Sequence, residues 1–170
     1  PDECPGLSDV YGEEYEKLYF KYVHEKRYKK IIKAQEIWTK ILELQIEKGV
    51  PYIGYKDSVN KKCNQKNIGT IKSSNLCMEI SLYSDENETA VCNLCSISLP
   101  KFVEYDSDNK PYYNFEKLRE VAEYVINPMN KIIDNNYYPT PEAKLSNMKH
   151  RPLGIGIQGL ADVYFKMKYP

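Results

Sequence analysis

Asn75-Leu76-Cys77-Met78-Glu79-Ile80 is the stretch around which the rest of the chain is organised. Polar and apolar side chains alternate in it, and this period of two predicts an extended strand. Asn75, Cys77 and Glu79 would then lie on one face, with neighbours about 6.6 Å apart along the strand. An amide, a thiol and a carboxylate in one line indicate chemistry on a small hydroxylated substrate. Taken alone, the alternation is more typical of an ordinary amphipathic strand with a polar outer face.

The composition is that of a globular chain. Its 170 residues suit one domain, and 42% of them are apolar, which is enough for a core. Basic and acidic residues number 24 each, so net charge favours neither nucleic acid nor an anionic membrane as a partner. No apolar run is long enough for a membrane span, and no signal-peptide pattern is present. The five scattered cysteines do not match a secreted disulfide framework, so we expect a reducing, cytoplasmic setting.

Helical periodicity predicts two amphipathic helices before the central stretch, over residues 9–25 and about 28–48. Aromatic side chains form the stripe of the first, and Gly49 followed by Pro51 ends the second. We expect both stripes to pack on other parts of the protein rather than to bind a ligand. The chain begins without Met and ends just after a helical pattern starts, so we expect a segment of a longer protein.

Short strands and further helices are predicted for the remainder. The expected elements are a loop or short helix over 51–70, an acidic turn over 83–89, a buried strand over 91–99, a polar hairpin or loop over 104–114, a helix capped by Asn114 and ended by Asn135-Asn136, a turn at Pro139 and Pro141, a strand over 153–157 and a helix from Gly159. Pro128 lies inside the capped helix and should kink or break it. Strands that alternate with long helices predict an α/β fold.

Gly154, Gly156 and Gly159 satisfy the dinucleotide-binding pattern G-x-G-x-x-G between a predicted strand and a predicted helix. In that interpretation backbone amides and a helix N-terminus would face a pyrophosphate. The same spacing also lets a strand and a helix approach closely. A nucleotide-binding oxidoreductase therefore stays open as an alternative, as does a helical interaction module without enzymatic activity.

Cys92-x-x-Cys95 raises the question of a zinc half-site or a redox pair. A second such pair is missing from the sequence, and His24 and His150 are remote from this one. Redox pairs usually open a helix, whereas these cysteines lie in a strand-like apolar run. Neither a zinc site nor an internal disulfide is favoured, and no metal site is predicted.

Several separated stretches together resemble the large, catalytic subunit of eukaryotic-type class I ribonucleotide reductase, in order and through essentially the whole chain. They are Tyr55-Lys56-Asp57 with Asn60, Lys62, Asn64 and Gln65, then Gly69-Thr70-Ile71-Lys72-Ser73-Ser74 leading into the central stretch, Val91-Cys92-Asn93-Leu94, Asn135-Asn136-Tyr137-Tyr138-Pro139, and His150-Arg151-Pro152-Leu153-Gly154-Ile155-Gly156-Ile157-Gln158-Gly159-Leu160-Ala161-Asp162. The family's chain is several times longer, so the resemblance implies an internal segment.

The resemblance implies part of a ten-stranded α/β barrel, with residues 1–50 helical and residues 51–170 carrying barrel strands, helices and a central loop with the active cysteine. The implied reaction reduces ribonucleoside diphosphates to deoxyribonucleoside diphosphates, which supply DNA replication. Cys77 matches the cysteine that becomes a thiyl radical and removes the ribose 3′ hydrogen. Glu79 matches the general base for the 3′-hydroxyl, and Asn75 matches the amide that binds the ribose hydroxyls. Burial of the loop in the barrel would shield the radical and raise the pKa of Glu79.

Cys92 matches one member of the redox disulfide, whose partner lies outside the segment. Cys95 departs from the family pattern and is treated as a buried bystander, while Cys4 and Cys63 receive no role. No cofactor is expected within the segment itself. The intact enzyme implies ATP and dNTP allosteric effectors, Mg²⁺ with the nucleotide, and a dimetal centre with a tyrosyl radical in a small subunit. The implied partners are that small subunit, a second large subunit, and thioredoxin or glutaredoxin, with neither nucleic acid nor a membrane. Alone, the segment should be inactive.

Overall fold

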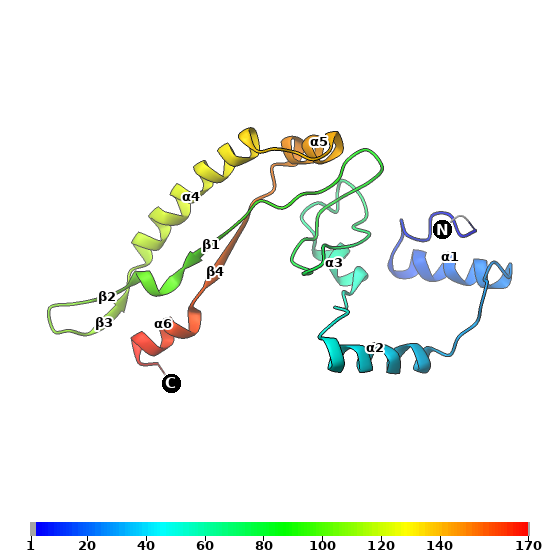
Figure 1. Ribbon diagram of the computed structural model, residues 1–170, viewed down its shortest axis with the longest axis horizontal. Coiled ribbons are helices and arrows are strands. Elements are labelled where there is room, and N and C mark those ends of the chain that lie inside the picture. The colour runs from blue at the N-terminus through cyan, green and yellow to red at the C-terminus, as the bar shows by residue number, and fades with distance from the viewer. Residues whose placement is uncertain (1–2, 170) are drawn as a thin grey trace. The chain divides into compact units, whose positions relative to one another are not determined.

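The computed structural model describes residues 3–169, which divide between Asp85 and Glu86 into two compact units (Figure 1). Each unit is described by itself. No helix within the described residues is both long and apolar enough to cross a lipid bilayer. The assignment of the whole chain to one barrel segment stays a prediction.

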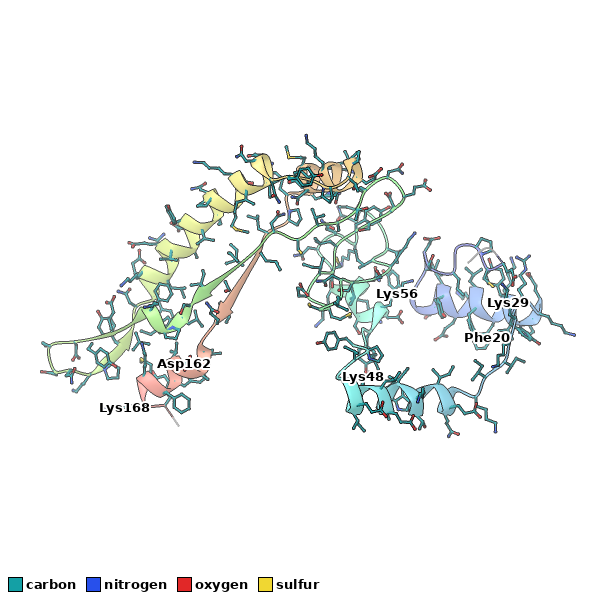
Figure 2. The ribbon with its side chains drawn as sticks, viewed as in Figure 1. Phe20, Lys29, Lys48, Lys56, Asp162 and Lys168 are labelled. Atoms are coloured by element: carbon teal, nitrogen blue, oxygen red, sulfur yellow. The ribbon has the colours of Figure 1, made fainter. Side chains whose placement is uncertain are left out.

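The first unit contains the helices α1 Gly12–His24, α2 Ala34–Lys48 and α3 Lys56–Lys62 (Figure 1). Both long helices confirm the periodicity, although α2 begins at Ala34 rather than near residue 28. It ends at Lys48, where predicted (Figure 2). The next residue, Gly49, adopts the left-handed conformation with φ of 72°. α3 shows that the polar stretch after Pro51 contains a short helix.

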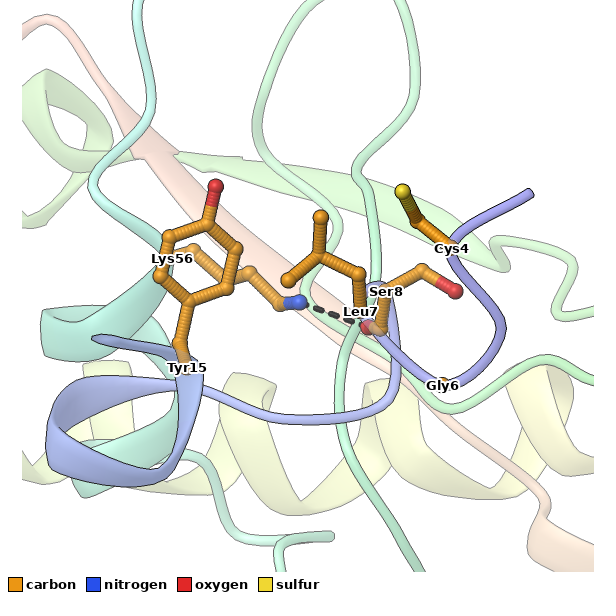
Figure 3. Close-up of a pocket in the computed structure, with 6 residues that line it drawn as sticks. All are labelled: Cys4, Gly6, Leu7, Ser8, Tyr15 and Lys56. Atoms are coloured by element: carbon orange, nitrogen blue, oxygen red, sulfur yellow. Dashed lines mark hydrogen bonds between the residues drawn. The ribbon is translucent and has the colours of Figure 1, made fainter. Parts of the chain in front are cut away.

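The segment before α1 is joined to α3 by polar contacts. The Lys56 Nζ atom donates to the backbone oxygens of Ser8, at 2.6 Å, and Val10, at 2.9 Å. The Asp57 Oδ1 atom accepts from the Gly12 amide at 3.0 Å. Lys56, Ser8 and Tyr15 line a cavity of about 460 Å³. Figure 3 shows the Lys56 contact with Ser8 there. These contacts attach α3 to the N-terminal segment of the unit. α3 in turn anchors the chain that leads into the central loop.

The apolar face of α2 is uncovered within the described residues. No residue of this helix is buried, and Trp38 is 50% and Ile46 87% exposed. The predicted packing of this stripe against other parts of the protein is not observed within residues 3–169.

The second unit is built on a parallel pair of strands, β1 Leu94–Ser98 and β4 Gly154–Gln158, in register from Leu94↔Gly154 to Ser98↔Gln158. Parallel strands need a crossover connection, which here contains the helices α4 Phe115–Asn135 and α5 Pro141–His150. The helix α6 Leu160–Met167 follows β4 (Figure 1). The predicted α/β alternation is confirmed for this unit. The predicted strand over 91–99 is shorter: it begins at Leu94, and it ends at Ser98 because Leu99–Phe102 form a 3₁₀ helix.

α4 begins at the predicted cap, where the Asn114 Oδ1 atom accepts from the Lys117 amide at 2.9 Å. The predicted break at Pro128 is wrong, because one helix runs to Asn135 with the proline inside it. Burial of Met129 and Ile133 on the same helix, 5% and 0% exposed, offsets the hydrogen bond that proline cannot make.

The polar hairpin is confirmed as the antiparallel strands β2 Val103–Tyr105 and β3 Pro111–Tyr113. Glu104 ties this hairpin to the first turn of α4. Its carboxylate accepts from Lys117 Nζ at 2.9 Å, from Asn114 Nδ2 at 3.0 Å and from Tyr112 Oη at 2.8 Å. These donors, Lys117 first, lower the pKa of Glu104 from 4.5 to about 2.

We therefore expect acid to weaken the attachment of the hairpin to α4. A carboxyl group with a lowered folded-state pKa contributes its full stabilisation above about pH 4.5 and loses it as the pH falls through about 2. An NMR titration of the Glu104 carboxyl carbon checks this directly. Glu104→Gln should remove the pH dependence of the hairpin, whereas Glu120→Gln, at an exposed position of α4, should leave it in place. A Glu104 midpoint near 4.5 would contradict the prediction.

Candidate active-site loop

The central stretch forms a turn, and the predicted strand over residues 75–80 is wrong. The Met78 amide donates to the Asn75 backbone oxygen at 3.2 Å, which closes a turn with Leu76 and Cys77 at its centre. Met78 has φ of 67°, a left-handed conformation that interrupts any strand and that residues other than glycine rarely adopt. Cys77 therefore lies at the tip of a turn, in agreement with the loop that the family resemblance implied.

Two side chains at the N-terminal side of the turn bind the backbone of Ile80 and so close the base of the loop. The Asn75 Oδ1 atom accepts from the Ile80 amide at 3.1 Å, and the Ser74 hydroxyl donates to the Ile80 backbone oxygen at 2.5 Å. Because the Ile80 amide can only donate, the oxygen of the Asn75 side chain must face it. Its Nδ2 donates to no acceptor among the described residues, so Asn75 can offer an N–H to the oxygen of a substrate hydroxyl.

Asn60 on α3 anchors the chain just before the loop. Its side chain is 1% exposed; its Oδ1 accepts from the Ile71 amide at 2.7 Å, and its Nδ2 donates to the Ile71 backbone oxygen at 3.0 Å. After the loop, the Cys63 Sγ atom donates to the Ser81 backbone oxygen at 3.2 Å. One end of the loop is thus fixed by a buried amide and the other by a thiol.

A close contact and a cavity lie behind the loop. A Cβ atom on Gly54 would lie 2.4 Å from the Met78 Cε atom, so the absence of a side chain at Gly54 leaves room for Met78. The cavity, about 330 Å³, is lined by residues that include Ile71, Ser74 and Met78. Sequence reasoning gave no individual role to Gly54, Asn60 or Ser74, since backbone anchoring leaves no periodic pattern. Only the resemblance drew attention to the stretch that contains Asn60.

The reactive side chains of the loop are open to solvent in this part of the protein. Cys77 and Glu79 are exposed, and Leu76 is 84% exposed. The predicted burial of Cys77 and Glu79 in a complete barrel is not observed within residues 3–169, and it stays a prediction for the full-length protein. Their assigned roles stay predictions.

The second unit holds Cys92 and Cys95. Cys92 is exposed just before β1, while Cys95 is half-buried on β1 and pairs in register with Ile155. Both are free thiols, so the internal disulfide is not formed. Among residues 3–169 no group of three or more His, Cys, Asp and Glu side chains could hold a metal ion, and the zinc alternative gains no support.

The glycines of the G-x-G-x-x-G pattern lie where backbone approaches are close. A Cβ atom on Gly154 would lie 2.5 Å from the Leu94 Cδ2 atom of β1. Gly159 caps α6 with φ of 76°, and a Cβ atom there would lie 2.7 Å from the Pro100 Cδ atom. Packing in the second unit accounts for Gly154 and Gly159, so a dinucleotide is not needed to explain them.

Comparison with known proteins gives a consistent picture. The family model of the ribonucleotide reductase barrel domain matches residues 1–170. The ribonucleoside-diphosphate reductase large subunit of variola virus is 57% identical over 170 residues, which cover the whole chain and 21% of that protein. Large chain 2 from Saccharomyces cerevisiae is 56% identical and covered to 20%, and the large subunit of Plasmodium falciparum is 56% identical and covered to 21%. The chain thus spans about a fifth of the length of the curated relatives it matches.

Proposed function

Because the chain belongs to the ribonucleotide reductase barrel-domain family, we propose that it supplies the active-site loop of a ribonucleoside-diphosphate reductase large subunit. The observation that carries the proposal is the position of Cys77, at the tip of a turn whose base is closed by Ser74 and Asn75. A thiol held at a turn tip is presented to a substrate while its backbone stays fixed.

In the proposed reaction the three side chains divide the work on one ribose. The Cys77 thiol loses a hydrogen atom to an oxidant that the small subunit supplies, and the resulting thiyl radical takes the 3′ hydrogen. Glu79 accepts the proton of the 3′-hydroxyl as a general base. Asn75 donates from Nδ2 to a ribose hydroxyl, because its Oδ1 atom is engaged by Ile80. Sulfur suits the first role because it exchanges hydrogen with carbon at modest cost.

The reduction requires two electrons, which we assign to thiols. Cys92 and a second cysteine outside this chain each give up one hydrogen and form one disulfide bond. These two hydrogen atoms carry the two electrons; one replaces the C2′ hydroxyl and the other leaves with that hydroxyl as water. Cys77 then returns the hydrogen atom to the 3′ carbon, which restores the thiyl radical. A thioredoxin or glutaredoxin then reduces the disulfide. This cycle needs reduced thiols at rest, so we place the protein in the cytoplasm.

The exposure of Cys77 sets a condition on the proposal. A thiyl radical must be protected from water and stray reductants, so the rest of the full-length protein must cover the loop. We propose that it does so by completing a ten-stranded barrel, to which β1 and β4 contribute one parallel pair. The uncovered apolar face of α2 would then be packed by the remainder of the barrel.

The proposed partners and effectors act outside residues 1–170. We assign ATP and dNTP effector sites, the Mg²⁺ that accompanies the nucleotide, and the contact with a second large subunit to the full-length protein. We assign the dimetal centre and its tyrosyl radical to the small subunit. The described residues do not fit such a centre, since they contain no suitable group of ligands.

Replacement of Glu79 by glutamine tests the proposed role of the loop. Glu79→Gln in the full-length enzyme should lower kcat by about 10²- to 10⁴-fold, because an amide cannot accept the 3′-hydroxyl proton. Release of tritium from 3′-labelled substrate, measured with the small subunit present, reports this step. Glu86→Gln, at an exposed position outside the loop, is the control. Undiminished tritium release in Glu79→Gln would overturn the assignment.

A further inference from the structure

Two sets of contacts tie the segment that carries Cys92 to α5. Upstream of Cys92, the Glu88 carboxylate is 4% exposed, accepts from Lys149 Nζ at 3.2 Å and lies 3.0 Å from His150 Nε2. The amide of Thr89, the next residue, donates to the Glu142 backbone oxygen at 3.2 Å. Downstream, the residue that directly follows Cys92 is Asn93, which is also held by α5. The exposed thiol thus lies between two attachments to one helix.

The downstream attachment is a buried pair of amide side chains. Asn93 is 6% and Asn147 1% exposed. Asn93 Nδ2 donates to Asn147 Oδ1 at 2.6 Å, and Asn147 Nδ2 donates back to Asn93 Oδ1 at 3.2 Å. The second hydrogen of each amide is also used: Asn93 donates to the Pro152 backbone oxygen at 2.9 Å, and Asn147 to the Tyr138 hydroxyl at 2.5 Å.

This network defines the orientation of its members. Tyr138 Oη donates its own hydrogen to the Ile133 backbone oxygen at 2.6 Å, so it must accept from Asn147. Every side-chain N–H of Asn93 and Asn147 therefore has a partner. No other side chain combines the size of asparagine with its two N–H donors and its oxygen acceptor. A buried network in which all polar groups are satisfied specifies one arrangement and is disrupted by the loss of any member.

We propose that Asn147 is a positioning residue for Cys92, which it holds through Asn93 in the place required for disulfide exchange. The inference rests on the proposed function, because it assigns the redox role to Cys92. Disulfide closure tolerates only narrow ranges of Cα separation and dihedral angle. The backbone at Cys92 must therefore stay fixed while its exposed sulfur reacts. A residue one position away, locked in a buried network, achieves this without contact with the sulfur itself.

The test measures the reactivity of individual thiols in the full-length large subunit. The fully reduced protein is treated with iodoacetamide under native conditions, and the alkylation rates of Cys92 and Cys77 are followed by peptide mass spectrometry. Asn147→Ala should change the Cys92 rate by about tenfold, because it leaves a buried amide of Asn93 unmatched and frees the adjoining backbone. The Cys77 rate should stay within about twofold. In steady state kcat should fall while KM for the nucleoside diphosphate is retained.

Asn60→Ala is the matched control. The Asn60 side chain belongs to the first unit and, like that of Asn147, is only 1% exposed. It anchors Ile71 before the Cys77 loop. Asn60→Ala should change the Cys77 rate and leave the Cys92 rate unchanged, the reverse of Asn147→Ala. A purely structural role for Asn147 predicts a lower Tm with both thiols affected alike, and this result would overturn the proposal, as would an unchanged Cys92 rate. If Asn147→Ala does not fold, Asn147→Ser is subjected to the same measurement and the same criteria.

Failure of the inference can be told apart from failure of the proposed function. If Cys92→Ser keeps full turnover with thioredoxin as reductant, the redox role of Cys92 is wrong and the positioning proposal, which depends on it, is overturned with it. If Cys92→Ser loses that turnover while Asn147→Ala leaves Cys92 alkylation unchanged, the proposed function stands and only the positioning role is wrong.

Discussion

The full-length enzyme with Cys77→Ser is expected to bind the nucleoside diphosphate and to lose turnover by about four orders of magnitude or more. A hydroxyl has nearly the size of a thiol but holds its hydrogen far more strongly, so the radical step cannot begin. Binding should persist because Asn75 keeps its hydrogen bond to the Ile80 amide and the loop keeps its shape. Equilibrium binding of the diphosphate and steady-state product formation, measured on the same preparation, check both parts.

Cys95→Ser is the matched control for this variant. Cys95 is another free thiol, half-buried on β1, and it has no role in the proposed reaction. Its replacement should leave turnover within a few-fold of the parent enzyme. Retained turnover in Cys77→Ser, or an equal loss in Cys95→Ser, would remove the basis for assigning the radical to the turn tip.

Cys92→Ser is expected to separate the two halves of the reaction. Repeated turnover with a thioredoxin should fall about a hundredfold or more, because the disulfide cannot form. Removal of the 3′ hydrogen is assigned to Cys77 and Glu79 and does not use Cys92, so tritium should still leave 3′-labelled substrate. The two signals, followed together in the presence of the small subunit, check the division of labour.

The outcome that contradicts this division is a parallel loss of both signals in Cys92→Ser. Such a loss would mean that Cys92 is needed before the radical step. The exposure of Cys92 beside a buried network argues for a later role, because the sulfur is accessible to a second thiol while its backbone is held.

Periodicity predicted the long elements well, because burial of one face leaves a regular trace in the sequence. α4 shows this clearly: its apolar stripe and the Asn114 cap gave both the helix and its first residue. The same reasoning failed at the central stretch. There Ser74 and Asn75 are polar because they bind the backbone of Ile80, and not because they face solvent from a strand.

Proline misled the sequence analysis in two opposite ways. A kink or a break was predicted at Pro128, and the break is wrong because the helix continues to Asn135, with Ile133 buried. A turn was predicted around Pro141, yet this residue opens α5. Proline suits the first turn of a helix, and the hydroxyl of Thr140 accepts from the Ala143 amide at 3.2 Å as an N-cap. The sequence Thr140-Pro141-Glu142 carried a helix-start signal, which the preceding Pro139 obscured.

The candidate site could be predicted only as a set of residue types. The order Asn75, Cys77, Glu79 indicated the chemistry. The anchors, Asn60 before the Cys77 loop and Asn147 beside Cys92, depend on contacts between residues 11 and 54 positions apart in the chain. Such contacts follow from the folded arrangement and leave no local pattern. The resemblance to a family supplied the roles, and the structure supplied the anchors.

Asparagine side chains hold the chain beside both proposed reactive cysteines. An amide neither gains nor loses a proton in the physiological range, and it does not react with radicals or peroxides as a thiol does. Through the proposed cycle, in which sulfur changes oxidation state and a carboxylate takes up a proton, these supports would remain chemically unaltered. A scaffold of inert hydrogen bonds therefore lets the reactive groups change repeatedly and return each time to the same starting geometry.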